Sequence, residues 1–119
     1  MSSQHQTYFI IAGEKSGDNH GADLMESLLK YKKNINFIGI GGDNMIKAGL
    51  HTIESIDNMA VMGFSEVIMH LFFFKKLMNR VLLEINNSNP NQIILIDYPG
   101  FNLRLAKKIK NKYNIPITY

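Results

Sequence analysis

Residues 92–102 read Gln-Ile-Ile-Leu-Ile-Asp-Tyr-Pro-Gly-Phe-Asn, and this segment is the most informative about the fold class. Its first five residues form a largely β-branched apolar run, as expected of a strand that is buried on both faces of a parallel sheet. A single carboxylate, Asp97, ends the run, and a Pro-Gly turn follows it. Residues 103–113 then repeat apolar side chains with the period of a helix. The stretch therefore predicts a strand, a polar turn and a helix, in that order.

The same alternation of strand and helix patterns continues in both directions along the chain. Further strands are expected at 8–12, 37–40, 52–56 and 115–119, and further helices at 18–31, 44–48 and 65–85. Such alternation indicates βαβ units and an α/β fold in which helices cover both faces of a parallel sheet. We expect the first, second and fourth strands to be central. Glu14, Asp18 and Asp97 should then lie near the carboxyl edge, where open α/β sheets bind ligands.

Composition excludes several classes of protein. A chain of 119 residues with 45% apolar and 19% charged residues can fold as one domain, so disorder is excluded. The absence of Cys excludes a disulfide scaffold and a thiol nucleophile, and neither a signal peptide nor a run of ~20 apolar residues is present. The net charge is +3, with basic residues concentrated in 104–112. We interpret that segment as a solvated face, and the lack of base-reading motifs predicts no nucleic-acid partner.

Residues 12–18, Ala-Gly-Glu-Lys-Ser-Gly-Asp, follow the first expected strand. Gly13 and Gly17 allow a tight strand-to-helix turn, so we expect a loop over 13–17. The spacing differs from that of a phosphate-binding P-loop. The carboxylates of Glu14 and Asp18 would repel a phosphate but suit the hydroxyl groups of a sugar. The alternative, that Asp18 caps the following helix and Glu14 is only solvated, stays open.

A second glycine-rich stretch, Gly-Ile-Gly-Gly-Asp-Asn-Met at 39–45, follows the second expected strand. It lacks the last glycine of the dinucleotide fingerprint and follows the wrong strand for one. A turn with Asp43 as the N-cap of a short helix explains it as well.

Asp97 is the best catalytic candidate on residue type and position. A carboxylate at the carboxyl end of a parallel strand faces the ligand crevice, and partial burial there would raise its pKa towards the range of a general base. The alternative is that Asp97 caps the turn or the next helix.

Apolar residues in the expected helix at 65–85 extend more than halfway around it at positions 71–74. Either this helix is deeply buried, or part of it lies in a membrane interface with lysines at the lipid headgroups. The candidate membrane contacts are Phe72, Phe73, Phe74, Lys75 and Lys76.

Four motifs together resemble the N-terminal half of the lipid-A-disaccharide synthases, bacterial glycosyltransferases with two Rossmann domains (the GT-B architecture). The motifs are Ala-Gly-Glu-x-Ser-Gly-Asp at 12–18, Gly-Gly-x-x-Met at 41–45, Val-Met-Gly-x-x-Glu-Val at 61–67 and Ile-Asp-x-Pro-x-Phe-Asn at 96–102. They occur in the family's order and cover nearly the whole chain, so the resemblance is specific.

The resemblance implies transfer of 2,3-diacylglucosamine from its UDP conjugate to 2,3-diacylglucosamine 1-phosphate, which forms a β-1,6 bond and releases UDP. It implies no metal or cofactor and a peripheral location on the cytoplasmic face of the inner membrane. Asp97 matches the family's proposed base. Positions matching the substrate-binding cleft are Glu14, Ser16, Gly17, Asp18 and Asn102.

The chain also departs from the family pattern. Gly100 stands where some members carry a second Asp, so a role for that carboxylate is not available here. The family also continues well past Tyr119. We therefore expect residues 1–119 to be a truncated acceptor-side domain that is inactive without the C-terminal UDP-binding domain. The alternative functions are a non-catalytic Rossmann-like ligand-binding domain and a phospho-receiver domain.

Overall fold

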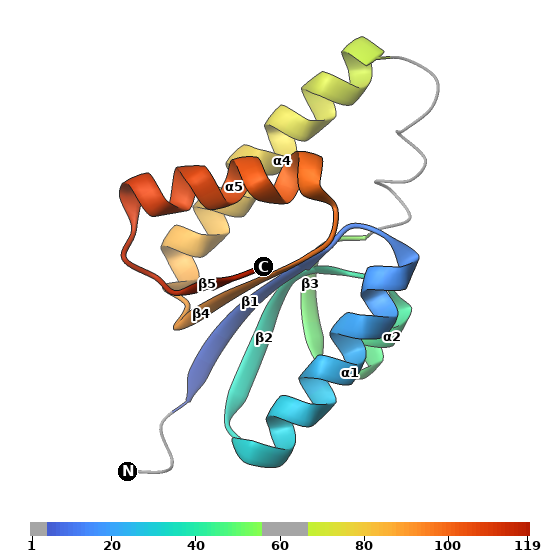
Figure 1. The fold of residues 1–119 in the computed structure, drawn as a ribbon, viewed down its shortest axis with the longest axis vertical. Coiled ribbons are helices and arrows are strands. Elements are labelled where there is room, and N and C mark those ends of the chain that lie inside the picture. The colour runs from blue at the N-terminus through green and yellow to red at the C-terminus, as the bar shows by residue number, and fades with distance from the viewer. Residues whose placement is uncertain (1–4, 56–66) are drawn as a thin grey trace.

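The computed structural model describes residues 5–55 and 67–119 and contains one parallel sheet with helices on both sides (Figure 1). The strands are β1 (Gln6–Ala12), β2 (Ile35–Gly41), β3 (Leu50–Ser55), β4 (Gln92–Ile96) and β5 (Ile117–Thr118). The helices are α1 (Lys15–Tyr31), α2 (Asp43–Lys47), α4 (Val67–Ser88) and α5 (Pro99–Lys112). The α/β class predicted from the sequence is confirmed.

The strands lie in the order β3-β2-β1-β4-β5, and all neighbours are parallel. The predicted central strands, the first, second and fourth, are therefore confirmed. This order is that of a Rossmann-like half-sheet. A phospho-receiver sheet has its third strand beside the first. Here β3 is at the edge, which excludes the phospho-receiver alternative.

Alternate side chains of the central strands point into two separate cores. Phe9 and Ile11 of β1 face α4 and α5, whereas Tyr8 and Ile10 face α1 and α2. Figure 1 shows the two helix pairs on opposite faces of the sheet. Because both faces are covered, β1 and β4 are apolar at nearly every position, which is why the sequence shows continuous runs in place of alternation.

Helix α1 begins at Lys15, and the loop expected over 13–17 is therefore too long. Gly17 lies inside the helix, and a Cβ there would lie 3.2 Å from the Cβ of Ala12 and 3.4 Å from Cγ2 of Ile96. The glycine thus brings the first turn of α1 close to the sheet. Glycine is a weak helix former in general, so the sequence pattern pointed to a loop.

Two other helices also extend beyond the predicted bounds. Helix α5 starts at Pro99, four residues early, because proline is well suited to the first helical position. Helix α4 continues through the polar residues to Ser88 and ends before Asn89, whose φ of 47° is left-handed. The expected N-cap of α4, Ser65, and the expected strand end at Ile56 lie outside the described residues.

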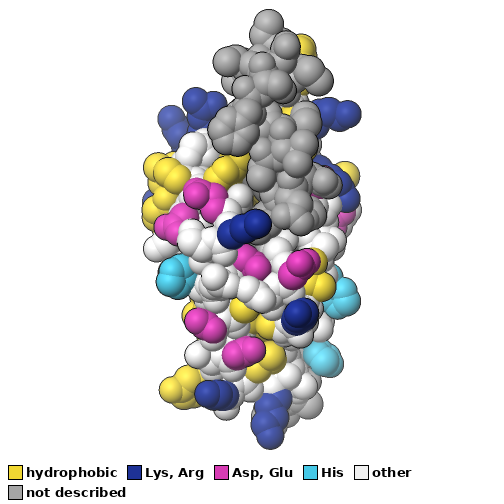
Figure 2. Space-filling model, turned by 90° about the vertical axis from the view of Figure 1, so that its right-hand side faces the viewer, with side chains coloured by type: hydrophobic (Ala, Val, Ile, Leu, Met, Phe, Trp, Pro, Cys, Tyr) yellow, Lys and Arg dark blue, Asp and Glu magenta, His cyan; other side chains and the backbone are white. Residues whose placement is uncertain are grey.

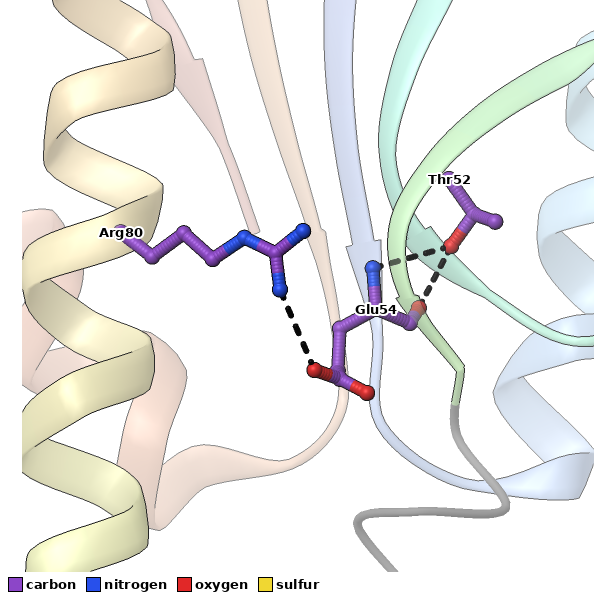
Figure 3. Close-up of polar contacts among 3 residues, drawn as sticks. All are labelled: Thr52, Glu54 and Arg80. Atoms are coloured by element: carbon purple, nitrogen blue, oxygen red, sulfur yellow. Dashed lines mark hydrogen bonds and ion pairs between the residues drawn. The ribbon is translucent and has the colours of Figure 1, made fainter.

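An ion pair links α4 to the edge strand β3 (Figure 3). Nη1 of Arg80 lies 3.4 Å from Oε2 of Glu54. The hydroxyl of Thr52 donates to the Glu54 carbonyl and accepts a hydrogen bond from the Glu54 amide at 3.2 Å, which shapes the end of β3. Glu54 lies near the carboxyl end of β3, so the pair connects α4 to the edge strand opposite to β5.

Candidate functional site

The carboxyl ends of β1 and β4 meet at the point where the strand order reverses. Ala12 pairs with Ile96, so the turns that follow them, 13–14 and 97–98, leave the sheet side by side. Beyond these turns the two chain segments separate, because β1 leads to α1 on one face of the sheet and β4 leads to α5 on the other (Figure 1). Such switch points are where open α/β sheets bind ligands. The predicted neighbourhood of Asp97 and the 13–18 segment is confirmed.

The turn after β4 consists of two consecutive left-handed residues. Asp97 has φ 51° and Tyr98 has φ 50°. Asp tolerates this region better than most residues, but a bulky Tyr does not. Backbone of this kind costs about 1–3 kcal/mol per residue and persists only where the surroundings enforce it.

Asn102 is one of the groups that enforce the turn. Its Nδ2 donates to the carbonyl of Asp97 at 2.7 Å and approaches that of Ile96 at 3.5 Å. The side chain is fully buried, and its Oδ1 accepts no hydrogen bond from the described residues. The amide therefore lies beneath the turn and positions it, and the substrate-binding role expected of Asn102 stays a prediction.

The Tyr98 ring supplies the second constraint. Ring centroids of Phe74 and Phe101 lie 5.8 Å and 6.1 Å from it. A Cβ at position 13 would lie 2.4 Å from Cγ of Tyr98, so only glycine permits this packing. Burial raises the pKa of the Tyr98 phenol to about 12, and the carboxylate of Glu14 acts in the same direction.

Sequence reasoning missed Tyr98. The signal that could have identified it is its position between the only carboxylate of the 92–102 stretch and a proline. Proline disfavours the right-handed helical conformation in the residue before it.

The Asp97 side chain itself is exposed. The partial burial expected for it does not occur among the described residues, because the turn projects beyond the end of β4. Glu14 and Ser16, on the neighbouring turn, are also exposed. The site therefore presents two carboxylates and a hydroxyl at one edge of the sheet, a set of hydrogen-bonding groups suited to the hydroxyl groups of a sugar.

Asp18 has a different place from the one expected. Its side chain is only 5% exposed, and its carboxylate accepts hydrogen bonds from the backbone amides of Gly42, Asn44 and Met45 at 2.9, 3.1 and 2.9 Å. It thus caps α2 and not its own helix α1. Gly42, and not Asp43, is the N-cap residue of α2. Gly17 is likewise buried, whereas Asp18 also borders a polar hollow. The substrate-binding roles expected of both residues stay predictions.

A polar hollow of about 400 Å³ lies on the α1–α2 side, with Lys15, Asn19, Asp43 and Lys47 among its lining residues. Figure 2 looks onto this side of the molecule and shows acidic and basic side chains interspersed over it. The charges are of mixed sign, so this face favours no single charge in a ligand.

Phe72, Lys75 and Lys76 of α4 are exposed, and Phe72 is exposed to 65%. Phe73 and Phe74 are partly buried against the core on the α4–α5 side. The prediction that at least one of the three phenylalanines is exposed is confirmed. No helix among the described residues is both long and apolar enough to cross a membrane. Within the same ranges, no three His, Asp or Glu side chains gather as metal ligands would.

Comparison with known proteins agrees with the resemblance seen in the motifs. The family model described as lipid-A-disaccharide synthetase matches residues 8–119. Lipid-A-disaccharide synthase 1 of Legionella pneumophila (strain Paris) is 41% identical over 110 residues, which are 92% of this chain and 29% of that protein. The corresponding synthase of Syntrophus aciditrophicus (strain SB) is 43% identical over 110 residues, 92% of this chain and 28% of its own length.

A third relative, the lipid-A-disaccharide synthase of Rickettsia bellii (strain OSU 85-389), is 42% identical over 105 residues, 87% of this chain. The chain thus spans less than a third of the length of these relatives. The family model, in contrast, covers all but the first seven residues. The chain therefore belongs to the lipid-A-disaccharide synthetase family.

Proposed function

We propose that this chain is the acceptor-side part of a lipid-A-disaccharide synthase and that Asp97 is its general base. The observation that carries the proposal is the exposed Asp97 carboxylate, held on a left-handed turn at the switch point of a sheet whose family is established. Strained backbone that neighbouring groups enforce is typical of sites where a side chain must be presented in one orientation.

The proposed donor is UDP-2,3-diacylglucosamine, and the proposed acceptor is 2,3-diacylglucosamine 1-phosphate. The acceptor hydroxyl oxygen attacks the anomeric carbon of the donor. A new C–O bond forms, the bond from that carbon to the UDP oxygen breaks, and the hydroxyl proton passes to Asp97. UDP leaves with the bonding electron pair. A single displacement of this kind inverts the anomeric configuration, which is consistent with a β-linked product.

Glu14 and Ser16 are proposed to bind sugar hydroxyl groups beside Asp97, since all three are exposed at the same edge. A second Rossmann-like domain, as in the GT-B architecture, is proposed to hold UDP. Residues 1–119 by themselves are accordingly expected to show no turnover.

A chimera tests the proposal. Residues 8–119 replace the matching segment of the Syntrophus aciditrophicus synthase, and disaccharide formation is measured with both lipid substrates. We expect the chimera to be active and Asp97→Asn to lower kcat about 10²–10⁴-fold, the usual contribution of a general base, with a much smaller change in KM. Proton NMR of the product's anomeric centre tests inversion.

Asp23→Asn is the matched control, because Asp23 is an exposed carboxylate on α1 away from the turn. Its kcat should equal that of the unmodified chimera. Near-normal turnover by Asp97→Asn would contradict the assignment of the base and leave Asp97 as a residue of the turn only.

The acylated substrates further lead us to propose peripheral binding to the cytoplasmic surface of the inner membrane. Support comes from Phe72, which is exposed next to the exposed Lys75 and Lys76 on α4. Interfacial binding grows with buried apolar area, and each basic side chain near an anionic surface adds about 1 kcal/mol.

Vesicle sedimentation with the active chimera tests membrane binding. On vesicles containing phosphatidylglycerol, Phe72→Ser should lower the bound fraction and added salt should lower it further. Tyr31→Ser is the control, because Tyr31 is 87% exposed at the far end of α1. Loss of thermal stability in Phe72→Ser, with unchanged vesicle binding of the folded protein, would contradict the proposal.

A further inference from the structure

A groove of about 240 Å³ lies between α4 and α5, on the opposite face from the polar hollow. Its apolar surface comes from Phe74, Met78 and Phe101, which belong to or pack against the core of that side. Its polar surface includes Lys75 of α4 and Arg104 and Lys108 of α5. The groove is therefore an apolar cleft bordered by cations that two different helices contribute.

The charge of the groove has one sign. Three of its lining residues are cationic, and none of the described residues that line it is acidic. The hollow beside α2, in contrast, includes Asp18 and Asp43 as well as lysines. Three cations that line one groove suit a dianionic phosphate monoester better than the single charge of a phosphodiester.

Gly100 also lines the groove, at the first turn of α5. A Cβ at this position would meet no heavy atom within 4 Å, so a side chain would fit there without displacing its neighbours. Some family members carry an Asp at position 100. Its absence here therefore changes the charge of the groove and not the packing around it.

The groove begins close to the proposed base. Gly100 is three residues beyond Asp97, and Arg104 is one helical turn farther along α5, a rise of about 6 Å. A sugar whose hydroxyl group reaches Asp97 could therefore place a substituent on the far side of its ring near Arg104. The ring's own apolar face would meet Phe74, which is partly buried.

We propose that Lys75, Arg104 and Lys108 bind the phosphate monoester of the acylated acceptor sugar. The inference rests on the proposed function, which names the acceptor, and it adds the site that selects the phosphorylated form. A volume of about 240 Å³ suits a phosphate and part of a sugar ring but not the acyl chains. The acyl chains would therefore extend out of the groove.

Direct binding to the 119-residue chain is the first test. Isothermal titration with 2,3-diacylglucosamine 1-phosphate in neutral detergent micelles is compared with the same lipid lacking phosphate. We expect the phosphorylated lipid to bind at least roughly 10-fold more tightly, and Arg104→Gln to remove most of that preference. Circular dichroism and melting curves establish that each variant is folded.

Two pairs of variants distinguish binding in the groove from a general effect of the protein's net charge. Lys110→Gln removes one positive charge from an exposed position of α5 outside the groove, and it should leave the preference for phosphate unchanged. Gly100→Asp should weaken binding of the phosphorylated lipid roughly 10-fold, whereas the isosteric Gly100→Asn should weaken it far less. Equal effects of Lys110→Gln and Arg104→Gln would overturn the proposal.

Phosphatidylglycerol vesicles test whether the groove binds the phosphate of membrane lipids in place of the phosphate of the acceptor sugar. If they bind with the same dependence on Arg104 and the phosphate monoester does not displace them, the groove is a membrane contact and the proposal is overturned. In the chimera, Arg104→Gln should raise KM for the acceptor about 10-fold and leave KM for the UDP donor unchanged. An inactive chimera whose 119-residue segment still prefers the phosphorylated lipid would overturn the proposed function alone.

Discussion

The two turns at the switch point both connect a parallel strand to a helix, but their backbone conformations differ. After β1 the chain turns through Gly13 and the extended Glu14, with φ −137°, and α1 starts at once. After β4 it turns through Asp97 and Tyr98, both left-handed and neither a glycine. The first turn is unstrained, whereas the second needs a buried amide and an aromatic cluster to hold it.

The buried polar groups near the two turns differ in the same way. Asp18 beyond the first turn has three backbone amides as partners on another element, and these amides account for its burial. Asn102 beyond the second turn bonds back to that turn, and the Asp97 carboxylate stays exposed. The difference indicates that Asp18 forms a structural joint between α1 and the start of α2, whereas the second turn leaves its own carboxylate, Asp97, exposed.

The largest effect on stability is expected at the structural joint. Asp18→Ala leaves the backbone amides of Gly42, Asn44 and Met45, at the start of α2, without their acceptor. It should lower the unfolding free energy by about 3–5 kcal/mol, measured by urea denaturation of the 119-residue chain. Asp18→Asn can keep the two bonds made by Oδ1 and should cost roughly half as much. Asp23→Asn, on the same helix but exposed, should change stability by less than about 0.5 kcal/mol. Similar losses for all three variants would contradict the capping role.

A smaller loss of stability combined with a loss of turnover is expected at the second turn. Asn102→Ala removes the bond to the Asp97 carbonyl and should cost about 1–2 kcal/mol, because the replaced side chain also had an unsatisfied oxygen. In the chimera, kcat should fall while KM changes little, since the base loses its orientation. Leu103→Ala, an exposed neighbour, is the control. If Asn102→Ala lowers the stability but leaves kcat normal, the second turn also has only a structural role.

The smallest effect is a pH dependence. The phenol of Tyr98 has a pKa of about 12 in the folded chain and an ordinary value of 10.0, because burial and Glu14 disfavour the phenolate. The folded state therefore holds the proton more tightly. The stabilising contribution is complete below pH 10 and is lost as the pH rises from 10 towards 12. Tyr98→Phe should flatten the fall in unfolding free energy over that range, and Tyr113→Phe should not.

Much of the fold could be predicted because the pattern of apolar and polar residues along the chain follows the pattern of burial. The β4 bounds agree with the prediction at both ends, since a strand covered on both faces is apolar along nearly its whole length, here from Ile93 to Ile96. Helix starts were less predictable. Gly17 and Pro99 are breakers in general, and only their packing against the sheet and their place in a first turn make them helical.

The site was partly predictable for the same kind of reason. The position of Asp97 at the end of a strand follows from the sequence, and so does its neighbourhood with Glu14. The roles of Asp18 and Asn102 do not follow from the sequence. The partners of Asp18 lie on another element, and Asn102 bonds to a turn whose left-handed backbone the proline after Tyr98 does not by itself specify.

Three features follow from the amino-acid sequence alone, because periodicity and residue type are local properties. They are the α/β class, the family motifs and the carboxylate at the end of β4. The packing of distant segments, in contrast, sets which carboxylate is exposed and which one accepts hydrogen bonds from backbone amides. It also brings Lys75, Arg104 and Lys108 together along one groove. Their convergence depends on the packing of α4 beside α5. That packing is set by the single core that α4 and α5 share on one face of the sheet. Contacts between distant segments cannot be read from either segment alone.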